Sequence, residues 1–533
     1  MNFKFFYNSV LFFSIIFSSL FLYTGCNDSD SEQPIPDEIL AIMNQERYSG
    51  ADWSLRVVDL DSGKLIYNLN TDNLLFTGSL RKIFSTGTLL NKIGADHRFL
   101  TPVHRQGEVD EDGVLSGHLI LVADGDLTLG GRRTPEDTVA FTNLDHIDAN
   151  AIGSAILTEP DVLAGLDDLA KQVADAGITK IEGEIIIDDR LFDKFNVPNG
   201  NRLITPIVVN DNLVDVTILP DEEGEDAILE VRPLTEAFQV VNEVVTVSEG
   251  EETDVEISQD VTNTGVVKGQ IAVDFNPNIF PGVDTLVQNF QIDDPSMFAR
   301  TAFIEALERA GVVVSTELLG PNPSELLPEE NSYTENTKVA EHLSLPYSEY
   351  ANLILKVSHN YGANLNLILL GVENGVRTVQ EALDVERMTL VDEFGLNGNG
   401  FNFPTNGSGS PDSQASPRAV VDFLTNINEK DIFQPFFNSL PVLGGPGSLR
   451  FTDEGSPATG NLRGKTGTTL DFNPETMQLT LVANTLGGYI DTVSGKRVAF
   501  ALFVNNVPIE GIEDVIESND DLGEIGTKIF ELN

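Results

Sequence analysis

The sequence predicts a protein of the α/β (α+β) class, in which one helix-and-strand domain is split by a large, mostly β insertion. Three observations point to this class. Helical and strand patterns mix over residues 38–104, and they mix again over residues 336–533. Between these parts, residues 105–335 consist mainly of short apolar runs separated by turns, which are typical of strands. The same mixture on both sides of a different stretch indicates a discontinuous domain.

The first part of the split domain contains three elements. Residues 36–47 carry apolar side chains at helical spacing. Residues 53–60 and 64–67 flank an Asp-Ser-Gly turn, which predicts a β-hairpin. A second helix is expected to begin near Ser79 and to stop at Gly94, because glycine is a common helix terminator.

The insertion and the second part follow the same reasoning. Within the insertion, residues 166–176 form the one clear helical pattern, and a further subdomain is expected at roughly 200–262. Its acidic clusters are interpreted as solvated loops. In the second part, the patterns predict helices at 347–357, 363–370, 377–394, 417–427 and 509–532, and strands at 479–486 and 497–505.

Composition excludes several classes of function. The chain of 533 residues has 32 Lys and Arg against 83 Asp and Glu, so its formal net charge is −51. Nucleic-acid binding is excluded, because it needs clustered basic residues. The only cysteine, Cys26, cannot form an internal disulfide, a thiolate zinc site or an iron–sulfur cluster. Since His-Glu-x-x-His and the phosphate-binding loop motif are also absent, we expect no metal and no cofactor.

The N-terminus predicts export. Residues 5–24 carry no charge and follow Lys4, which is typical of a secretory signal, although about 20 apolar residues could also span a membrane. Leu22-Tyr23-Thr24-Gly25-Cys26 resembles the lipobox of bacterial lipoproteins, with Tyr23 in place of the usual Leu. We therefore expect a signal peptide over 1–25, a lipid on Cys26, and an acidic tether over 26–37. The protein would then be anchored in the bacterial cell envelope, at the periplasmic or surface face of the outer membrane.

The first motif that could carry out chemistry is Ser79-Leu80-Arg81-Lys82. It places a hydroxyl and an amine three positions apart at a helix start, so both project from one face. The positive end of a helix disfavours an ammonium ion and offers N–H groups to an oxyanion. A serine activated by a neighbouring amine is a known nucleophile. Taken alone, however, the motif favours a simpler interpretation. The lysine would be an exposed residue on an ordinary helix, and the serine would be the cap of that helix.

Two further motifs change this balance. Ser358-His359-Asn360 lies between two helical segments and could be an ordinary helix–loop junction. Lys465-Thr466-Gly467-Thr468 precedes the C-terminal strands and could be an edge strand with a surface lysine. Its glycine would let backbone approach a ligand, while its lysine and hydroxyls could bind a carboxylate. In this order the three motifs match the Ser-x-x-Lys, Ser-x-Asn and Lys-Thr-Gly set of penicillin-recognising serine enzymes.

The sequence resembles the class C low-molecular-mass penicillin-binding proteins, which are D-alanyl-D-alanine carboxypeptidases and endopeptidases. In that family a large insertion separates the first two motifs, as it does here. Further similar segments are 119–129, 177–184, 209–215, 241–246, 440–450 and 497–506. The resemblance implies a transpeptidase-like domain, an antiparallel sheet flanked by helices, formed by 38–104 and 336–533. The residues between, 105–335, would form one or two β-rich domains.

The resemblance also implies roles for the matching residues. The catalytic residues would be the nucleophile Ser79, its base Lys82, the proton relay Ser358, the amide-binding Asn360 and the electrostatic residue Lys465. The residues that bind the terminal carboxylate would be Thr466, Gly467 and Thr468, and the N–H groups of Ser79 and Thr468 would form the oxyanion hole. The substrates would be peptidoglycan peptides, with β-lactams as inhibitors and no cofactor.

Two departures from the family pattern concern the substrate. The family loop Asp-Gly-Ser-Gly-Leu-Ser-Arg reads here from Asn406 to Asp412, so an acidic residue replaces the arginine that helps to bind the stem peptide. Residues 470–481 also predict a longer loop after the third motif. Two alternatives stay open at this point: a non-catalytic cell-wall-binding lipoprotein on the same scaffold, and a slow β-lactamase or esterase.

Overall fold

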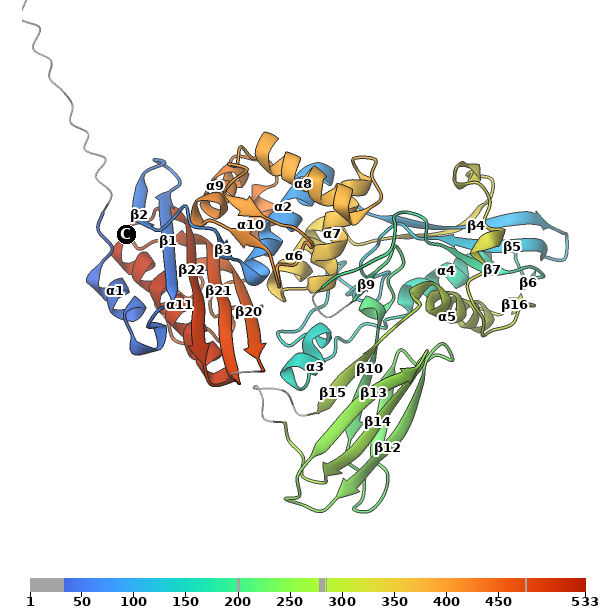
Figure 1. The fold of residues 1–533 in the computed structure, drawn as a ribbon. Coiled ribbons are helices and arrows are strands. Elements are labelled where there is room, and N and C mark those ends of the chain that lie inside the picture. The colour runs from blue at the N-terminus through green and yellow to red at the C-terminus, as the bar shows by residue number, and fades with distance from the viewer. Residues whose placement is uncertain (1–32, 199–201, 278–282, 284, 475–476) are drawn as a thin grey trace, which may run out of the picture.

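The computed structural model describes residues 33–198, 202–277, 283, 285–474 and 477–533 (Figure 1). The predicted signal peptide, Cys26 and most of the tether therefore lie outside the described residues. Within the described ranges, no helix has the length and apolar character needed to cross a membrane.

A five-stranded antiparallel sheet joins the two ends of the chain (Figure 1). Its strand order is β2-β1-β22-β21-β20, and the strands are β1 (Asp52–Asp59), β2 (Leu65–Leu69), β20 (Leu462–Asn473), β21 (Gln478–Asp491) and β22 (Arg497–Ile509). β1 pairs with β22 along its whole length, from Asp52 opposite Asn505 to Asp59 opposite Val498. The predicted hairpin and both predicted C-terminal strands are confirmed, and the pairing makes the two separated parts of the chain one folded unit.

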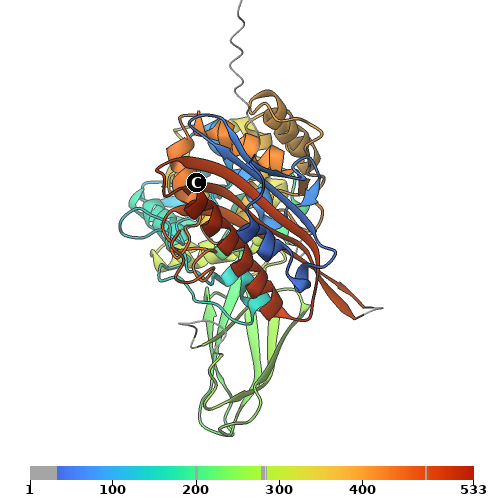
Figure 2. The same ribbon diagram turned by 90° about the vertical axis from the view of Figure 1, so that its left-hand side faces the viewer.

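Both faces of this sheet are buried, which explains the continuous apolar run in β22. Phe500, Leu502 and Val504 belong to the core under α1 (Asp37–Met43) and α11 (Ile512–Leu532). Ala501 and Phe503, which point the opposite way, belong to the core on the helical side. Alternate side chains of a strand point to opposite faces, so a strand covered on both sides needs apolar residues throughout. In Figure 2 the red helix α11 lies across the first of these faces.

The second face carries the helices that surround the predicted catalytic motifs. They are α2 (Lys82–Ile93), α6 (Tyr347–Lys356), α7 (Asn360–Val372), α8 (Val379–Asp392), α9 (Pro417–Asn428) and α10 (Phe433–Ser439). α7 is buried on all sides, from Tyr361 to Gly371, and packs against both α2 and α8. This packing brings the first and second motifs together. The sequence did not predict α10, which is only two turns long.

The inserted part contains a six-stranded mixed sheet. Its strands are β4 (Leu100–Val109), β5 (Val114–Val122), β6 (Lys180–Ile181), β7 (Ile185–Asp188), β16 (Val313–Val314) and β17 (Lys338–Leu343). Two helices pack on it, α4 (Ala164–Asp175) and α5 (Pro295–Arg309). The prediction of α4 is confirmed, but α5 was missed. Most of the α5 side chains are buried, so the helix lacks the polar stripe from which helical periodicity is recognised.

Two three-stranded sheets complete the insertion. One has the order β11-β10-β15 and the other β12-β14-β13, and Figure 1 shows the second projecting away from the rest of the molecule. Their strands are β10 (Leu213–Leu219), β11 (Ile228–Arg232), β12 (Gln239–Val247), β13 (Asp254–Val261), β14 (Thr264–Ala272) and β15 (Leu286–Gln291). The domain boundaries near 105 and 335, and the subdomain at 200–262, stay predictions.

Short elements connect these sheets. They are β3 (Leu75–Phe76), β8 (Phe195–Asn196), β9 (Leu203–Ile204), β18 (Phe401–Asn402), β19 (Gln414–Ala415), α3 (Ala149–Ile152), and the single turns η1 (Glu46–Tyr48), η2 (Gly78–Arg81), η3 (His146–Asp148), η4 (Asn210–Asn212), η5 (Ser324–Leu326) and η6 (Glu330–Ser332). Three of them, η2, η3 and η4, carry side chains that shape the candidate active site.

Candidate active site

Ser79 lies in the tight turn that precedes α2. The sequence predicted one helix from Ser79, but η2 is a 3₁₀ turn and the α-helix begins at Lys82. The two predicted residues still face each other, because Lys82 Nζ lies 2.7 Å from Ser79 Oγ. Ser79 is partly buried, whereas Lys82 is fully buried. The interpretation of Lys82 as an exposed surface lysine is therefore wrong.

Lys82 also contacts the second motif. Its Nζ donates to Asn360 Oδ1 at 2.7 Å and to the backbone oxygen of Ser408 at 3.1 Å. Asn360 is the first residue of α7, and Ser358 lies in the turn between α6 and α7 with a left-handed φ of 62°. Three distant segments of the chain thus converge on one amine.

Burial decides the charge of Lys82. Removal from water lowers the pKa of its amine well below the ordinary value, and the positive charge of Lys465 lowers it further. The carboxylate of Asp148 acts in the opposite direction but is outweighed. This shift favours the neutral amine, which can accept the proton of the Ser79 hydroxyl.

The third motif lies within β20, the edge strand of the five-stranded sheet, rather than before the C-terminal strands. Lys465 is fully buried and donates to the backbone oxygen of Thr466 at 2.7 Å. Its burial lowers the pKa of the amine to about 7, although Asp148 partly opposes the shift. Thr466 Oγ1 donates to Ser448 Oγ at 3.0 Å.

Two glycines allow β20 to lie directly against the turn of the nucleophile. A Cβ on Gly467 would lie 2.1 Å from the backbone oxygen of Thr77, and one on Gly78 would lie 2.7 Å from the backbone nitrogen of Thr468. Gly78 also has a positive φ of 49°, which favours glycine. Because of this close approach, the N–H of Thr468 lies beside the turn that carries Ser79, as an oxyanion hole requires.

Arg81 is a site-supporting residue that the sequence analysis missed. Its guanidinium is completely buried and forms a two-pronged ion pair with Glu386 of α8, with Nη1 2.9 Å from Oε1. The ring of Phe403 covers it at 3.9 Å. The ion pair attaches the nucleophile turn to α8. No sequence signal could have shown this, because Glu386 is one of many acidic residues.

The insertion also contributes a charged group, Asp148 of η3. Its carboxylate acts on the pKa values of both Lys82 and Lys465, and burial raises its own pKa. Asp148 follows no motif and lies far from both lysines in sequence. Only the folded chain reveals that the insertion reaches the site.

The loop that departs from the family pattern packs beside the nucleophile. Ser410 Oγ lies 2.6 Å from Thr469 Oγ1 of β20. The carboxylate of Asp412 is turned into its own loop, where Thr405 Oγ1 donates to its two oxygens at 2.9 and 3.0 Å.

The other departure is corrected by the structure. Residues 470–481 are not a longer loop, because β20 continues to Asn473 and β21 begins at Gln478. The two strands are therefore extended at this end, and they project past the other strands in Figure 2.

Comparison with known proteins agrees with this geometry. Residues 36–524 match the model of the D-Ala-D-Ala carboxypeptidase 3 (S13) family. The chain belongs to this family. A D-alanyl-D-alanine carboxypeptidase of Actinomadura sp. (strain R39) is 26% identical over 518 residues, which cover 88% of this chain and 80% of that protein. This S13 family chain is therefore a serine peptidase of the D-alanyl-D-alanine carboxypeptidase family, as predicted.

Solved structures confirm the fold of this S13 family member. Penicillin-binding protein 4 of Haemophilus influenzae has a TM-score of 0.66 and 16% identity, with 92% of this chain and 99% of that chain covered. The same protein in complex with a β-lactam has a TM-score of 0.65 and 16% identity, with 93% and 99% covered. The predicted penicillin-recognising fold with an insertion, and the resemblance to low-molecular-mass penicillin-binding proteins, are both confirmed.

We expect Gly467→Ala to abolish most of the acylation of Ser79 while the protein stays folded. A methyl group at this position would push β20 away from the nucleophile turn, and displacements of about 1 Å can cost about 100-fold in rate. The measurement is the rate of labelling by fluorescent penicillin. Gly320→Ala is the control, because no atom lies within 4 Å of a Cβ there. Equal labelling of the two variants would contradict the expectation.

We also expect a bell-shaped pH dependence of the second-order acylation rate constant, which reports free-enzyme pKa values. The rate should rise with pH as Lys82 loses its proton, and it should fall as Lys465, with a pKa of about 7, loses the charge that attracts a carboxylate. Lys465→Arg keeps its charge at high pH, so its alkaline limb should move upward. An alkaline limb at the same pH in both proteins would show that Lys465 does not cause it.

Proposed function

We propose that the protein cleaves the D-alanyl-D-alanine ends, or the D,D-cross-links, of peptidoglycan stem peptides through an acyl-enzyme on Ser79. The observation that carries this proposal is the position of Lys82 Nζ, buried and within 2.7 Å of both Ser79 Oγ and Asn360 Oδ1. A neutral amine in this position makes the serine hydroxyl a nucleophile at neutral pH.

In the acylation step, Ser79 Oγ attacks the carbonyl carbon of the penultimate D-alanine while Lys82 Nζ takes its proton. The negative charge on the carbonyl oxygen is stabilised by the N–H groups of Ser79 and Thr468. The peptide C–N bond then breaks. The leaving amino group takes a proton from Ser358, which is replenished from Lys82, so that each proton is accounted for.

In the second step, water attacks the ester carbon of the acyl-enzyme. Lys82 accepts a proton from the water, the ester C–O bond breaks, and Ser79 recovers its hydroxyl proton. The products are a shortened stem peptide and the free enzyme. A ring-closed β-lactam would follow the acylation step, but its amine would stay attached to the acyl group.

Substrate recognition is assigned to β20. Lys465 supplies positive charge, and Thr466 and Thr468 supply hydroxyls for the terminal carboxylate. The substrate would lie along this edge strand beyond Gly464, whose N–H donates to the backbone oxygen of Pro441. The R39 relative is named a carboxypeptidase, and the Haemophilus influenzae structure holds a β-lactam, which supports these two ligand classes.

We expect fluorescent penicillin to label the wild-type protein covalently and Ser79→Ala not at all, because the variant lacks the acylated oxygen. Ser494→Ala, which changes an exposed serine between β21 and β22, is the matched control and should be labelled normally. An unlabelled, folded wild type would refute the proposal. Rapid release of hydrolysed drug would favour a β-lactamase over a peptidase, and purified cell-wall peptides would separate loss of D-alanine from cleavage of cross-links.

We further propose that the protein is exported and held in the cell envelope by a lipid on Cys26. The support is the sequence alone: an uncharged stretch over 5–24, a lipobox-like segment ending at the chain's only cysteine, and a polar tether before α1. The tether would let the folded enzyme reach peptidoglycan from the membrane surface.

For the anchor, Cys26→Ser is expected to move the protein from the membrane fraction to the soluble envelope fraction. Incorporation of a labelled fatty acid should be lost at the same time, because serine offers no thiol for the lipid. Penicillin labelling should be unchanged and serves as the control for folding. A Cys26→Ser protein that still sediments with membranes would contradict the lipid anchor.

A further inference from the structure

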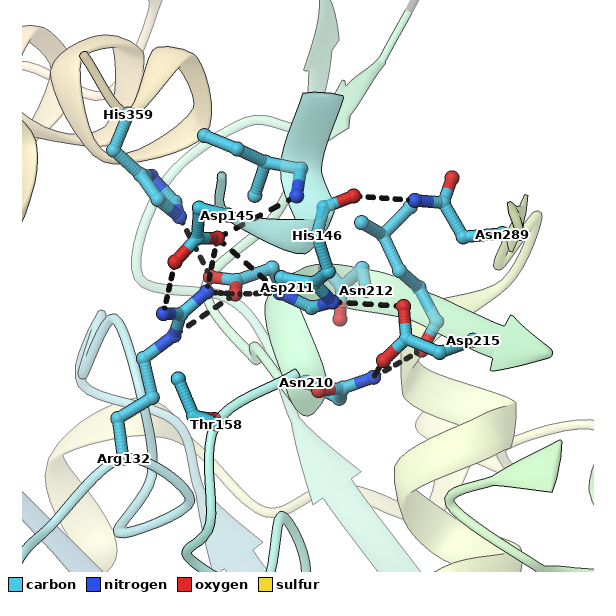
Figure 3. Close-up of polar contacts among 12 residues, drawn as sticks. Arg132, Asp145, His146, Thr158, Asn210, Asp211, Asn212, Asp215, Asn289 and His359 are labelled. Atoms are coloured by element: carbon cyan, nitrogen blue, oxygen red, sulfur yellow. Dashed lines mark hydrogen bonds and ion pairs between the residues drawn. The ribbon is translucent and has the colours of Figure 1, made fainter. Parts of the chain in front are cut away.

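A buried network of polar and charged side chains lies between the inserted part and the second motif (Figure 3). Its members are Arg132, Asp145, His146, Asp211, Asp215 and His359, and all six are buried. Five of them belong to the insertion. The sixth, His359, stands between Ser358 and Asn360 in the sequence. The motif pattern leaves this middle position unspecified, but the structure gives it a definite partner.

The partner is the turn η4, which has an unusual backbone. Asn210, Asp211 and Asn212 have left-handed φ angles of 50°, 56° and 55°. Asn and Asp tolerate this region better than other residues with side chains. The turn is held from both sides, because Asn210 Nδ2 donates to Asp215 Oδ2 at 3.0 Å and the N–H of Val209 donates to Asn212 Oδ1 at 3.1 Å.

This turn contacts both neighbours of Asn360. Asp211 Oδ1 lies 3.1 Å from His359 Nε2, which precedes Asn360. Asn212 Nδ2 donates to the hydroxyl of Tyr361, which follows Asn360, at 3.0 Å. Asn360 itself accepts from Lys82. The insertion therefore holds the catalytic motif at the two positions that flank its asparagine.

The hydrogen bonds of His359 define its tautomer. Its Nδ1 accepts from the N–H of Gly362 at 3.0 Å, at the start of α7, so the ring hydrogen is on Nε2 and faces Asp211. Among the described residues, neither His359 Nε2 nor Asp211 Oδ1 forms a regular hydrogen bond, and the 3.1 Å contact between them is the polar contact recorded for both atoms. Since both atoms are buried, loss of one would leave the other unpaired.

The second oxygen of Asp211, Oδ2, contacts two other residues of the network. Oδ2 accepts from Arg132 Nη2 at 2.7 Å and lies 2.8 Å from His146 Nε2. Burial alone would lower the pKa of His146, but Asp215 and Asp211 raise it to about 10, so His146 is a charged donor. Asp211 thus faces two cations with Oδ2 and the ring nitrogen of His359 with Oδ1, an arrangement that needs the two acceptor oxygens of a carboxylate.

We propose that Asp211 is a positioning residue of the reaction: it fixes His359, and thereby sets where the Ser358 hydroxyl and the Asn360 amide stand relative to Lys82. The inference rests on the proposed roles of Ser358 and Asn360. It makes the insertion a part of the catalytic apparatus, because the second motif is held by a residue that lies far from it in sequence.

Asp211→Asn tests this role at constant side-chain size, and it also removes the negative charge that faces Arg132 and His146. Asparagine has the same size and tolerates the left-handed backbone. Its one carbonyl oxygen would stay with the cations Arg132 and His146, so its NH₂ group would face the N–H of His359. Two donors would then meet, and His359 cannot exchange its nitrogens without losing the bond from Gly362. The ring, and the motif with it, would have to move.

The experiment measures acylation of the full-length protein by fluorescent penicillin, with rates expressed per titrated active site. For Asp211→Asn we expect the acylation rate constant to fall about 10- to 100-fold, since small misplacements of catalytic groups have effects of this size. The binding constant for the drug should stay nearly unchanged, because β20 is untouched. Acylation at the wild-type rate would overturn the proposal.

A matched control separates positioning from general destabilisation. Glu184→Gln removes a partner of Arg300, another buried arginine of the insertion that lies 3.1 Å from Glu184, and it has no contact with the second motif. This variant should lose thermal stability but acylate normally per active site. If Glu184→Gln slowed acylation as strongly as Asp211→Asn, the effect would be structural and the proposal would fail.

A double-mutant cycle with His359→Leu tests the route of the effect. The leucine variant should acylate as slowly as Asp211→Asn, and adding Asp211→Asn to it should slow acylation no further. Full additivity would overturn the inference, and the leucine variant decides the question alone if Asp211→Asn does not fold. Absence of labelling in wild type would refute the proposed function itself, which distinguishes the two failures.

Discussion

The burial of Lys82 is the constraint on which the rest of the structure depends. Among the described residues, the polar contacts of its amine are with uncharged oxygens, those of Ser79, Asn360 and Ser408. An amine in such surroundings is driven to the neutral form, because a buried charge without a partner is costly. Packing therefore creates the proposed catalytic base, because α2, α7 and the loop at Ser408 must all be in place to exclude water from the amine.

The unspecified residues of the motifs serve to hold these segments. Arg81 stands between Ser79 and Lys82, and His359 stands between Ser358 and Asn360. Both side chains point away from the reacting groups into buried pairs, with Glu386 of α8 and with Asp211 of the insertion. Breaking a buried pair by removing one partner leaves an uncompensated polar group, so these pairs fix each motif to a rigid neighbour. The residues at the unspecified positions of the motifs, Arg81 and His359, therefore hold the neighbouring motif side chains in position.

The strongly acidic surface places a further demand on the site. A net charge of −51 repels anionic polymers at long range, so attraction for a carboxylate has to be local. In the proposed function Lys465 supplies this attraction from a buried position on β20, with a pKa of about 7. Asp148 of the insertion moderates this charge and that of Lys82. The insertion thus acts on the site in two ways, through the field of Asp148 and through the contacts of η4.

The sequence by itself determined the elements with clear periodicity, such as α4, α9 and the β1–β2 hairpin. It also determined the three motifs, because the residues of each motif lie only a few positions apart in the chain. It missed α5, whose buried sides leave no polar stripe, and it took the extension of β20 and β21 for a loop. Only the tertiary structure decided that Lys82 is buried, that Arg81 pairs with Glu386, and that Asp148 and Asp211 reach the site. The reason is physical: local patterns record spacing along the chain, whereas burial and the pairing of charges depend on which distant segments the fold brings together.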